Sequence, residues 1–133
     1  MRTVHVVGLV LAACVATTPA GALDINSFRA EHHLPRLHVS AALARAAAAH
    51  ARDMAARDSL DHDGFRARIA PLVKSAGAEN VAWGCATADC VYRVWAKSSG
   101  HRENMLMRNI THYGLASAAA HNGRRYWALE LGN

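Results

Sequence analysis

Three short polar segments of this chain carry the residue types that bind metals or move protons. They are Asp61-His62-Asp63-Gly64, Glu79-Asn80 and Ser98-Ser99-Gly100-His101-Arg102-Glu103-Asn104. Each falls at an expected helix end or turn, and apolar stretches separate them, so only the fold can bring them together. If they converge, His62, Glu79 and His101 form a His-Glu-His cluster that could hold a divalent metal ion such as zinc, or one catalytic water.

The spacing of these three residues and the absence of known catalytic motifs limit the reactions that such a cluster could catalyse. Two neutral imidazoles and a carboxylate with an open fourth position are the ligands of many hydrolytic zinc sites. Their spacing here is long, unlike the helical H-E-x-x-H pair of metalloproteases, and no G-x-S-x-G nucleophile turn occurs. Metal-dependent catalysis therefore stays open, with Glu79 as the catalytic candidate if there is one.

A purely structural interpretation of the same residues also stays open. Glu79 at a buried turn would accept backbone N–H bonds, and His101 after Gly100 would hold a helix end. Asn80 and Asn104 are suited to organising such turns because their amides both donate and accept hydrogen bonds.

The remaining histidines carry less chemistry in this interpretation. His50 lies on the apolar face of an expected helix and is predicted to be a core group. His112 is expected at the start of a strand, where it could border the cleft in which the three polar segments would meet. The others are predicted at the surface or in loops: His32, His33, His38 and His121.

Apolar periodicity and capping residues predict the elements that must position these motifs. Helices are expected at 24–33, 40–58, 65–76 and 87–98, with a short turn or helix at 101–106 and with Pro71 kinking or shortening the third helix. Residues 79–83 are expected to form a buried strand or turn. Segments 113–118 and 125–131 flank Asn122-Gly123, the strongest short hairpin signal. Helices followed by paired strands predict an α+β domain with helices packed on an antiparallel sheet.

The first 22 residues are predicted to be a secretory signal peptide. Arg2 and His5 precede a short apolar run, and Ala20-Gly21-Ala22 supplies the small residues of a cleavage site. The run is far shorter than the roughly 20 apolar residues of a membrane-spanning helix. Leu11-Ala12-Ala13-Cys14 also has the form of a lipoprotein processing site, in which Cys14 would carry the lipid anchor. Both alternatives predict export to the periplasm or the cell exterior, with one domain at 23–133.

Cysteine content agrees with an exported protein, and the distribution of charge bears on its partners. Cys85 and Cys90 bracket a four-residue loop and predict a disulfide, because a C-x4-C pair alone lacks the four ligands of a structural zinc site. The net charge is +5, but the basic residues are scattered along the chain rather than clustered with aromatic residues, which argues against a nucleic-acid partner. Attraction to anionic membrane or cell-wall surfaces stays open.

The order of these motifs resembles that of the CAP superfamily, which includes cysteine-rich secretory proteins, wasp-venom antigen five, plant pathogenesis-related proteins and many exported bacterial proteins. The matching segments are Asn26-x-x-Arg29, Leu37, Leu43-x-x-x-Ala47-x-x-His50-Ala51-x-Asp53-Met54-Ala55, His62-x-Gly64, Glu79-Asn80-Val81-Ala82, Trp95-x-x-Ser98-x-Gly100-His101-Arg102-x-Asn104-Met105-Leu106, Tyr113-Gly114-Leu115-Ala116 and Tyr126-Trp127-Ala128-Leu129-Glu130-Leu131-Gly132. They cover nearly all of residues 23–133. The resemblance implies a three-layer α-β-α sandwich with a cleft where the motifs converge.

The cleft of that family carries two histidines and one or two acidic residues. By position, His62, Glu79 and His101 match three of them. Ser98 stands where eukaryotic members have a second glutamate, as it commonly does in bacterial members, and Ala78 replaces the usual glycine before Glu79. One carboxylate fewer weakens the case for tight metal binding, because ligand number and charge set the affinity.

Two functions of different classes remain open, and the resemblance implies the first of them. The first, which we favour, is a non-enzymatic exported module that binds a lipid, a sterol or a cell-surface ligand. Trp83, Trp95 and Leu60 are candidates for its apolar walls, or else core residues. The second is a metal-dependent hydrolase of peptides or cell-envelope material that uses the same cleft. Fold alone does not decide between them.

Overall fold

The computed structural model describes residues 21–133. The predicted signal peptide, apart from its last two residues, and the candidate lipoprotein residue Cys14 lie outside this range. The described elements are α1 (Ile25–Glu31), β1 (His38–Val39), α2 (Ala41–Arg57), α3 (Phe65–Ile69), a 3-10 turn (Ala70–Leu72), β2 (Gly77–Trp83), α4 (Ala88–Ala96), α5 (Ser99–Met105), β3 (His112–Ala119) and β4 (Arg125–Gly132). None of these helices is long and apolar enough to cross a membrane.

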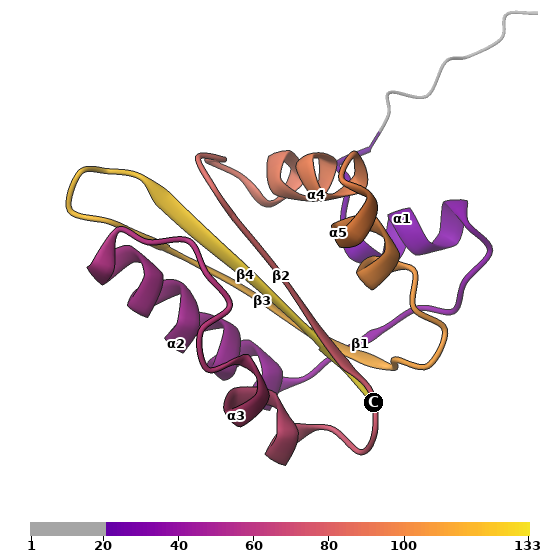
Figure 1. The fold of residues 1–133 in the computed structure, drawn as a ribbon. Helices are drawn as coiled ribbons and strands as arrows, with labels where there is room; N and C mark the ends of the chain where they lie inside the picture. Colours follow the sequence, from indigo (N-terminus) through magenta and orange to yellow (C-terminus); the bar gives the residue numbers. More distant parts are fainter. Residues whose placement is uncertain (1–20) are drawn as a thin grey trace, which may run out of the picture.

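A four-stranded sheet forms the middle layer of the domain (Figure 1). Its strand order is β1-β3-β4-β2, with β4 antiparallel to both β3 and β2 and with β1 parallel to β3. β3 and β4 form the hairpin predicted from Asn122-Gly123, and Gly123 takes a left-handed backbone with φ 85° in the turn. α2 and α3 lie on one face of the sheet, and α1, α4 and α5 lie on the other. The predicted three-layer α-β-α sandwich is confirmed.

The predicted capping residues begin three of the helices. Asp24, Ser40 and Thr87 precede α1, α2 and α4, and the side chain of each accepts a backbone N–H from the first turn of its helix. Each bond satisfies a donor that the helix itself leaves unpaired, which is typically worth about 1 kcal/mol.

Three elements differ from the sequence prediction. The helix expected at 65–76 ends at Ile69 and continues only as a 3-10 turn, because Pro71 has no backbone N–H for a longer helix. β2 begins at Gly77, two residues earlier than expected, and pairs with β4 along its whole length. β1 has only two residues, too few for periodicity to reveal.

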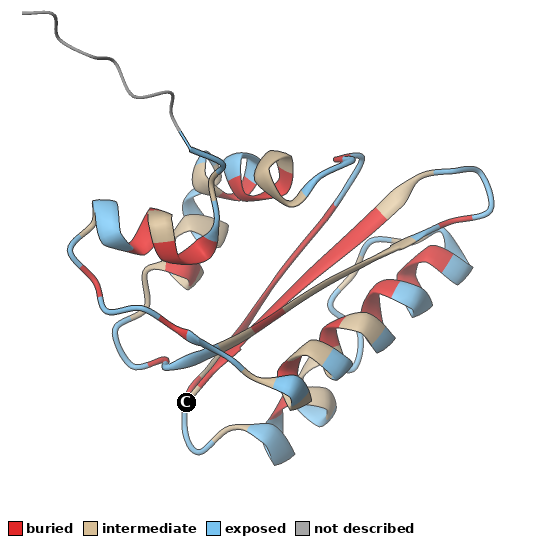
Figure 2. Ribbon diagram, turned by 180° about the vertical axis from the view of Figure 1, so that it is seen from behind, coloured by how far each residue is buried: buried red, intermediate tan, exposed pale blue. Residues whose placement is uncertain are grey.

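The apolar core has two parts, one on each side of the sheet. β4 is buried along nearly all of its length, and α2 turns its buried side to the sheet (Figure 2). Trp95 is fully buried on the α4 side and donates to the Val81 carbonyl at 3.2 Å, so it is a core residue rather than a cleft wall. Trp83 is half exposed, and the Arg124 guanidinium lies 4.2 Å from its ring centre.

Polar side chains fasten α1 and the loop after it to the rest of the domain. Arg29, fully buried, donates to the carbonyls of Pro35, Met105 and Met107 at 2.8–2.9 Å. Asn26 exchanges two hydrogen bonds with the backbone of Leu37, at 2.7 and 3.0 Å. These bonds explain why the Asn26-x-x-Arg29 motif has polar residues on the buried side of a helix.

A covalent bond closes the turn before α4. Cys85 and Cys90 form the predicted disulfide, with their α-carbons 5.6 Å apart. The Trp127 indole N–H donates to the Cys85 carbonyl at 2.8 Å, which ties the same turn to β4.

α2 packs directly against β3 at Gly114. A β-carbon at this position would lie 2.1 Å from the backbone nitrogen of Ala44 and 2.3 Å from the carbonyl carbon of Leu43. Real atoms do not approach so closely, and backbone atoms cannot rotate away, so the helix sits at this distance because residue 114 has no side chain.

We predict that Gly114→Ala destabilises the domain by about 3 kcal/mol, because α2 must move away from the sheet. Chemical denaturation measures the change in the free energy of unfolding. Gly100→Ala is the matched control, since nothing lies within 4 Å of a β-carbon there. It should be neutral or slightly stabilising in α5. Equal stability of the two variants would contradict the close packing.

Candidate functional site

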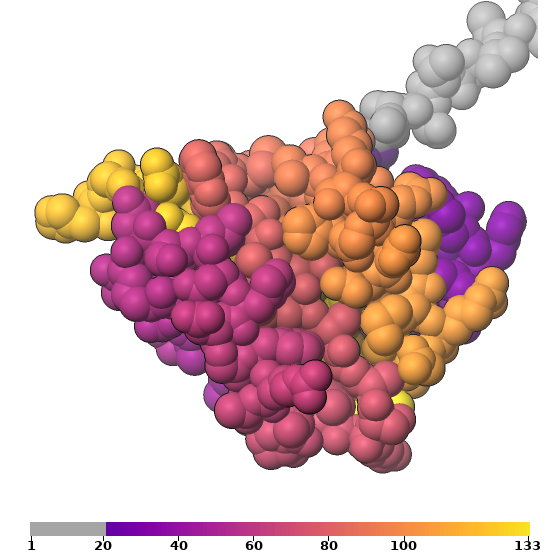
Figure 3. All heavy atoms as spheres, viewed as in Figure 1, coloured from indigo at the N-terminus to yellow at the C-terminus, as the bar shows by residue number. Residues whose placement is uncertain are grey.

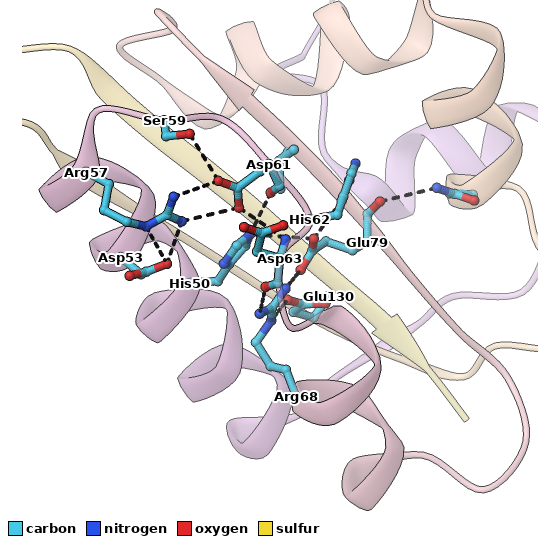
Figure 4. A network of polar contacts seen from close by, with 12 residues as sticks. His50, Asp53, Arg57, Ser59, Asp61, His62, Asp63, Arg68, Glu79 and Glu130 are labelled. Carbon is cyan, nitrogen blue, oxygen red and sulfur yellow. Dashed lines mark hydrogen bonds and ion pairs between the residues drawn. The ribbon is translucent and has the colours of Figure 1, made fainter.

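Glu79 is the centre of a buried polar cluster between the sheet and α3 (Figure 4). It lies on β2, directly opposite Glu130 on β4. Arg68 of α3 contacts both carboxyl groups: its Nη2 pairs with Oε2 of Glu79, and its Nε donates to Oε1 of Glu130 at 3.0 Å. The side chains of both glutamates are at most 1% exposed. Two buried acids thus share a single guanidinium.

The two carboxyl groups differ in protonation state. Burial raises the pKa of Glu130 to about 9, and the neighbouring Glu79 adds to this effect against the opposing pull of Arg68. Burial also acts to raise the pKa of Glu79, but the contacts with Glu130, Arg68 and His62 outweigh it and hold that pKa below its ordinary value. At neutral pH Glu79 is therefore ionised and Glu130 keeps its proton.

Arg68 balances the charge of the two carboxyl groups. Its Nε donates to Oε1 of Glu130, and Oε2 has no other hydrogen-bond partner among the described residues. The pair carries one negative charge, which the guanidinium balances.

His62 is oriented by this ionised carboxylate. Its Nδ1 lies 2.7 Å from Oε1 of Glu79, and a carboxylate only accepts hydrogen bonds, so Nδ1 carries the hydrogen. In the neutral form of the ring the lone pair is then on Nε2. The side chain is 55% exposed, whereas its partner Glu79 is buried. A buried acid behind an exposed imidazole is the arrangement that orients catalytic and metal-binding histidines.

The loop that carries His62 is held at several points. Asp61 accepts from Arg57 at 2.8 Å and from the Asp63 backbone N–H at 3.1 Å. Arg68 also donates to the Asp63 carbonyl at 2.9 Å. His62 accepts a bond from the Phe65 N–H at 3.0 Å through its carbonyl, which starts α3. The motif Asp61-His62-Asp63-Gly64 thus leads into α3 through a hydrogen-bonded turn, with Gly64 in the left-handed region at φ 73°.

His50 belongs to the cluster, although its helix position predicts only a core residue. It is buried, and its Nε2 donates to the Asp61 carbonyl at 2.8 Å while lying 3.6 Å from Oε1 of Glu79. The prediction of a buried, satisfied histidine is correct. The bond that orients His50 toward Glu79 comes from Asp61, eleven residues later in the chain, so the helix pattern alone does not reveal this contact.

His101 lies on α5, on the other side of β2. Its ring centre is 6.5 Å from that of Trp95, and its Nδ1 is buried without a hydrogen-bond partner among the described residues. Burial lowers the pKa of this imidazole, and a proton on the nearby His62 would lower it further by repulsion, so His101 is neutral at pH 7. No hydrogen bond joins its side chain to Glu79 or His62 in the described part of the chain.

The predicted amides connect α5 to β2. Asn80 donates to the His101 carbonyl at 2.9 Å, and Asn104 donates to the Asn80 side chain at 2.9 Å and to the Glu79 carbonyl at 3.4 Å. These bonds have the organising role that the structural interpretation gives to the two asparagines. Ser98 is the N-cap of α5, but its side chain makes no capping bond.

The donor atoms that remain free decide how well the site suits a metal ion. Within residues 21–133, no three histidine, cysteine, aspartate or glutamate side chains are grouped so that they could hold one. Both oxygens of Glu79 face the donors of His62 and Arg68. The atoms left for an ion are Nε2 of His62 and the ring nitrogens of His101, of which Nδ1 is buried. The three-ligand site of His62, Glu79 and His101 stays a prediction. In the structure Glu79 contacts the Nδ1 atom of His62 from the buried side of the ring.

Open space adjoins His62. A depression of about 550 Å³ is lined by His62, Asp63, Gly64, Phe65, Arg66 and Ala67. In the space-filling view, β2 is visible between the α2–α3 part of the chain, in magenta, and α5, in orange (Figure 3). A ligand in the depression can reach the exposed imidazole.

Three residues of the cluster could not be assigned from the sequence. Glu130 carries a weak signal, because it is one acid within the apolar segment Tyr126–Gly132. Arg68 carries none, since arginines on a short helix ordinarily face solvent. His50 is predicted as buried but without chemistry.

Comparison with known proteins is informative about the whole domain. The family model described as the cysteine-rich secretory protein family, CAP, matches residues 24–131. The Bacillus subtilis protein YkwD is 32% identical over 98 residues, which are 68% of this chain and 38% of that protein. The chain therefore spans well under half the length of this curated relative.

Solved structures show the same fold. An outer surface protein of Borrelia burgdorferi has a TM-score of 0.73 at 19% identity, over 82% of this chain and 86% of its own. An extracellular SCP-domain protein of Bacillus anthracis has a TM-score of 0.65 at 24% identity, over 79% of this chain and 37% of its own. A cysteine-rich secretory protein of Staphylococcus aureus has a TM-score of 0.65 at 20% identity, over 80% of this chain and 35% of its own.

The charge states of the two glutamates predict how stability depends on pH. The pKa of Glu130 is higher in the folded protein than the ordinary value of 4.5, so between about pH 4.5 and 9 only the folded state holds this proton. Its contribution to the free energy of unfolding therefore falls as pH rises, by up to about 1.4 kcal/mol per pH unit. Glu130→Gln cannot lose a proton. We predict that this variant folds and gains stability relative to the wild type from pH 5 to pH 9.

Denaturation curves at several pH values measure this difference. Glu103→Gln, a change at an exposed glutamate of α5, is the control and should follow the wild type at every pH. Parallel pH profiles of the wild type and Glu130→Gln would show that Glu130 is ionised in the folded protein.

Proposed function

We propose that this chain, which belongs to the CAP family of cysteine-rich secretory proteins, is an exported binding domain for a lipid or another amphiphilic ligand of the cell envelope. In this proposal residues 23–133 form one domain and the protein does not need to be an enzyme. A sterol or a cell-surface component is an alternative ligand of the same kind. The proposal rests chiefly on a groove between α1 and α4.

The groove combines an apolar floor with a charged rim. Its volume is about 270 Å³, and it is lined by Leu23, Phe28, Ala96, Glu31, Arg93 and Lys97. Two cations and one acid at the edge of an apolar cleft suit an acyl chain with an anionic headgroup. Arg93 is engaged by Asp89 at 2.9 Å, whereas Lys97 forms no ion pair within residues 21–133. Lys97 is therefore the cation available to the headgroup.

Two observations and one sequence prediction support export. The domain contains a disulfide, which persists in oxidising compartments. The solved relatives include an outer surface protein and an extracellular protein. The predicted signal peptide at residues 1–22, or lipid attachment at Cys14, would direct the chain to such a location. An N-terminal mass of the exported protein separates these two routes.

The binding proposal predicts that the charge of Lys97 matters. Lys97→Glu should weaken binding of a fluorescent fatty acid at least tenfold, because it places a second acid beside Glu31 at the rim. Lys74→Glu is the matched control, since Lys74 is the other lysine of the chain, is exposed and does not line the groove. Mass spectrometry of a lipid extract from the purified protein identifies the ligand. Equal affinity of both variants would reject the groove as the site.

The geometry of His62 favours one alternative function, a metal-dependent hydrolase of peptides or cell-envelope material. The buried Glu79 fixes the tautomer of His62 and leaves its Nε2 free beside the open depression. His101 is neutral and has an unpaired nitrogen. A divalent ion such as zinc, held by these two imidazoles, would polarise a substrate carbonyl and acidify a water. The chain's own residues would orient the imidazoles and keep Glu79 ionised.

We predict that His62→Ala abolishes any hydrolysis of peptidoglycan or casein while leaving the fold intact, because the side chain is largely exposed. His101→Ala should remove the same activity and reduce the heat of zinc binding in calorimetry. His121→Ala, in the exposed hairpin turn, is the control for both measurements. Unchanged heats and activity in His62→Ala and His101→Ala would reject the hydrolase, and would leave the lipid proposal untouched.

A further inference from the structure

A second pair of imidazoles meets at the other edge of the sheet. His38 of β1 and His112 of β3 are direct partners in the parallel register, so their side chains project from the same face. Their ring centres are 5.9 Å apart. Both residues are exposed, and neither belongs to the cluster around Glu79.

We propose that His38 and His112 bind one divalent transition-metal ion, such as Zn²⁺, Cu²⁺ or Ni²⁺, that bridges β1 and β3. Neutral imidazole is a preferred ligand of these ions. Two imidazoles that share a tetrahedral ion at about 2.1 Å from each nitrogen have ring centres about 5 Å apart. The observed separation is closed by small rotations of two exposed side chains. Water completes the coordination of the ion.

The hydroxyl group of Thr111 favours the tautomer of His112 that can coordinate a metal ion through Nε2. Oγ1 of Thr111 lies 2.8 Å from Nδ1 of His112. When Thr111 accepts from Nδ1–H, the lone pair of the ring is on Nε2, the atom that then coordinates the ion. The exposed position requires no desolvation of the ligands. Lys74, which lines a depression with His112, limits the affinity for a cation and favours ions with strong imidazole bonds.

The ion would fasten the shortest strand of the sheet. β1 has only two residues, and the backbone bonds at its ends are His38 N–H to Thr111 O and Ser40 N–H to Tyr113 O, each 2.9 Å. β1 joins α1 to α2, so the bridge would hold the start of the domain against β3. Only the folded chain brings residues 38 and 112 together, and the ion therefore stabilises the folded state.

Calorimetric titration of the untagged protein with Zn²⁺, Ni²⁺ and Cu²⁺ tests the proposal. The background is the variant His62→Ala/His101→Ala, so that the site described above contributes nothing. In this background we expect one bound ion, and a loss of affinity of at least about tenfold on either His38→Ala or His112→Ala, because each removes one of two ligands. The combined variant has neither ligand and should bind at least as weakly as either single variant. His121→Ala should bind as the background does.

Thermal unfolding supplies a second measurement. The ion should raise the Tm of the background protein and should leave the Tm of His38→Ala unchanged. His38→Gln and His112→Gln replace the alanine variants if those do not fold. Absence of binding to the background, or equal binding after loss of His38 or His112, would overturn the proposal. Binding to the wild type but not to the His62→Ala/His101→Ala background would also overturn it, and would support the hydrolase site instead.

Discussion

One guanidinium shared by two buried carboxyl groups holds α3 against the sheet. Glu79 and Glu130 are direct neighbours across β2 and β4, and Arg68 contacts both. Like charges opposite one another on adjacent strands repel. The arrangement persists because Glu130 keeps its proton and Arg68 neutralises Glu79. Removing one member of such a pair typically costs about 3–5 kcal/mol, since the remaining charge stays buried. The position of α3, and of the loop before it, follows from this contact.

Structure and chemistry therefore depend on the same carboxylate. Glu79 balances the charge of Arg68 through one oxygen and orients the exposed His62 through the other. His50 approaches that second oxygen and also holds the loop through the Asp61 carbonyl. An imidazole supported in this way has a defined tautomer before any ligand arrives, which is the preorganisation that binding and catalysis both require. The cluster explains why so few side chains suffice to build a site on an edge strand.

The sheet separates this site from the apolar groove of the opposite layer. On that side Arg29 and Asn26 fasten α1, and the disulfide closes the turn before α4. The groove between the two helices is thus bordered by elements that are each anchored independently of Glu79. A ligand in the groove and a ligand at His62 would contact different layers of the sandwich. The domain can in this way present two surfaces of different chemistry on one small core.

Local patterns of the sequence determined most of the elements. Asp24, Ser40 and Thr87 cap helices, Pro71 limits α3, Asn122-Gly123 turns the hairpin, and the Cys85–Cys90 pairing follows from spacing, because each of these effects acts over a few residues. The order of motifs, through a family resemblance, added the three-layer sandwich. Only the tertiary structure decided which side chains meet. Arg68 and Glu130 join Glu79 from 11 and 51 residues away, and His38 meets His112 through a strand of two residues. Charge state and tautomer depend on such distant contacts and on burial, and neither leaves a local pattern in the chain.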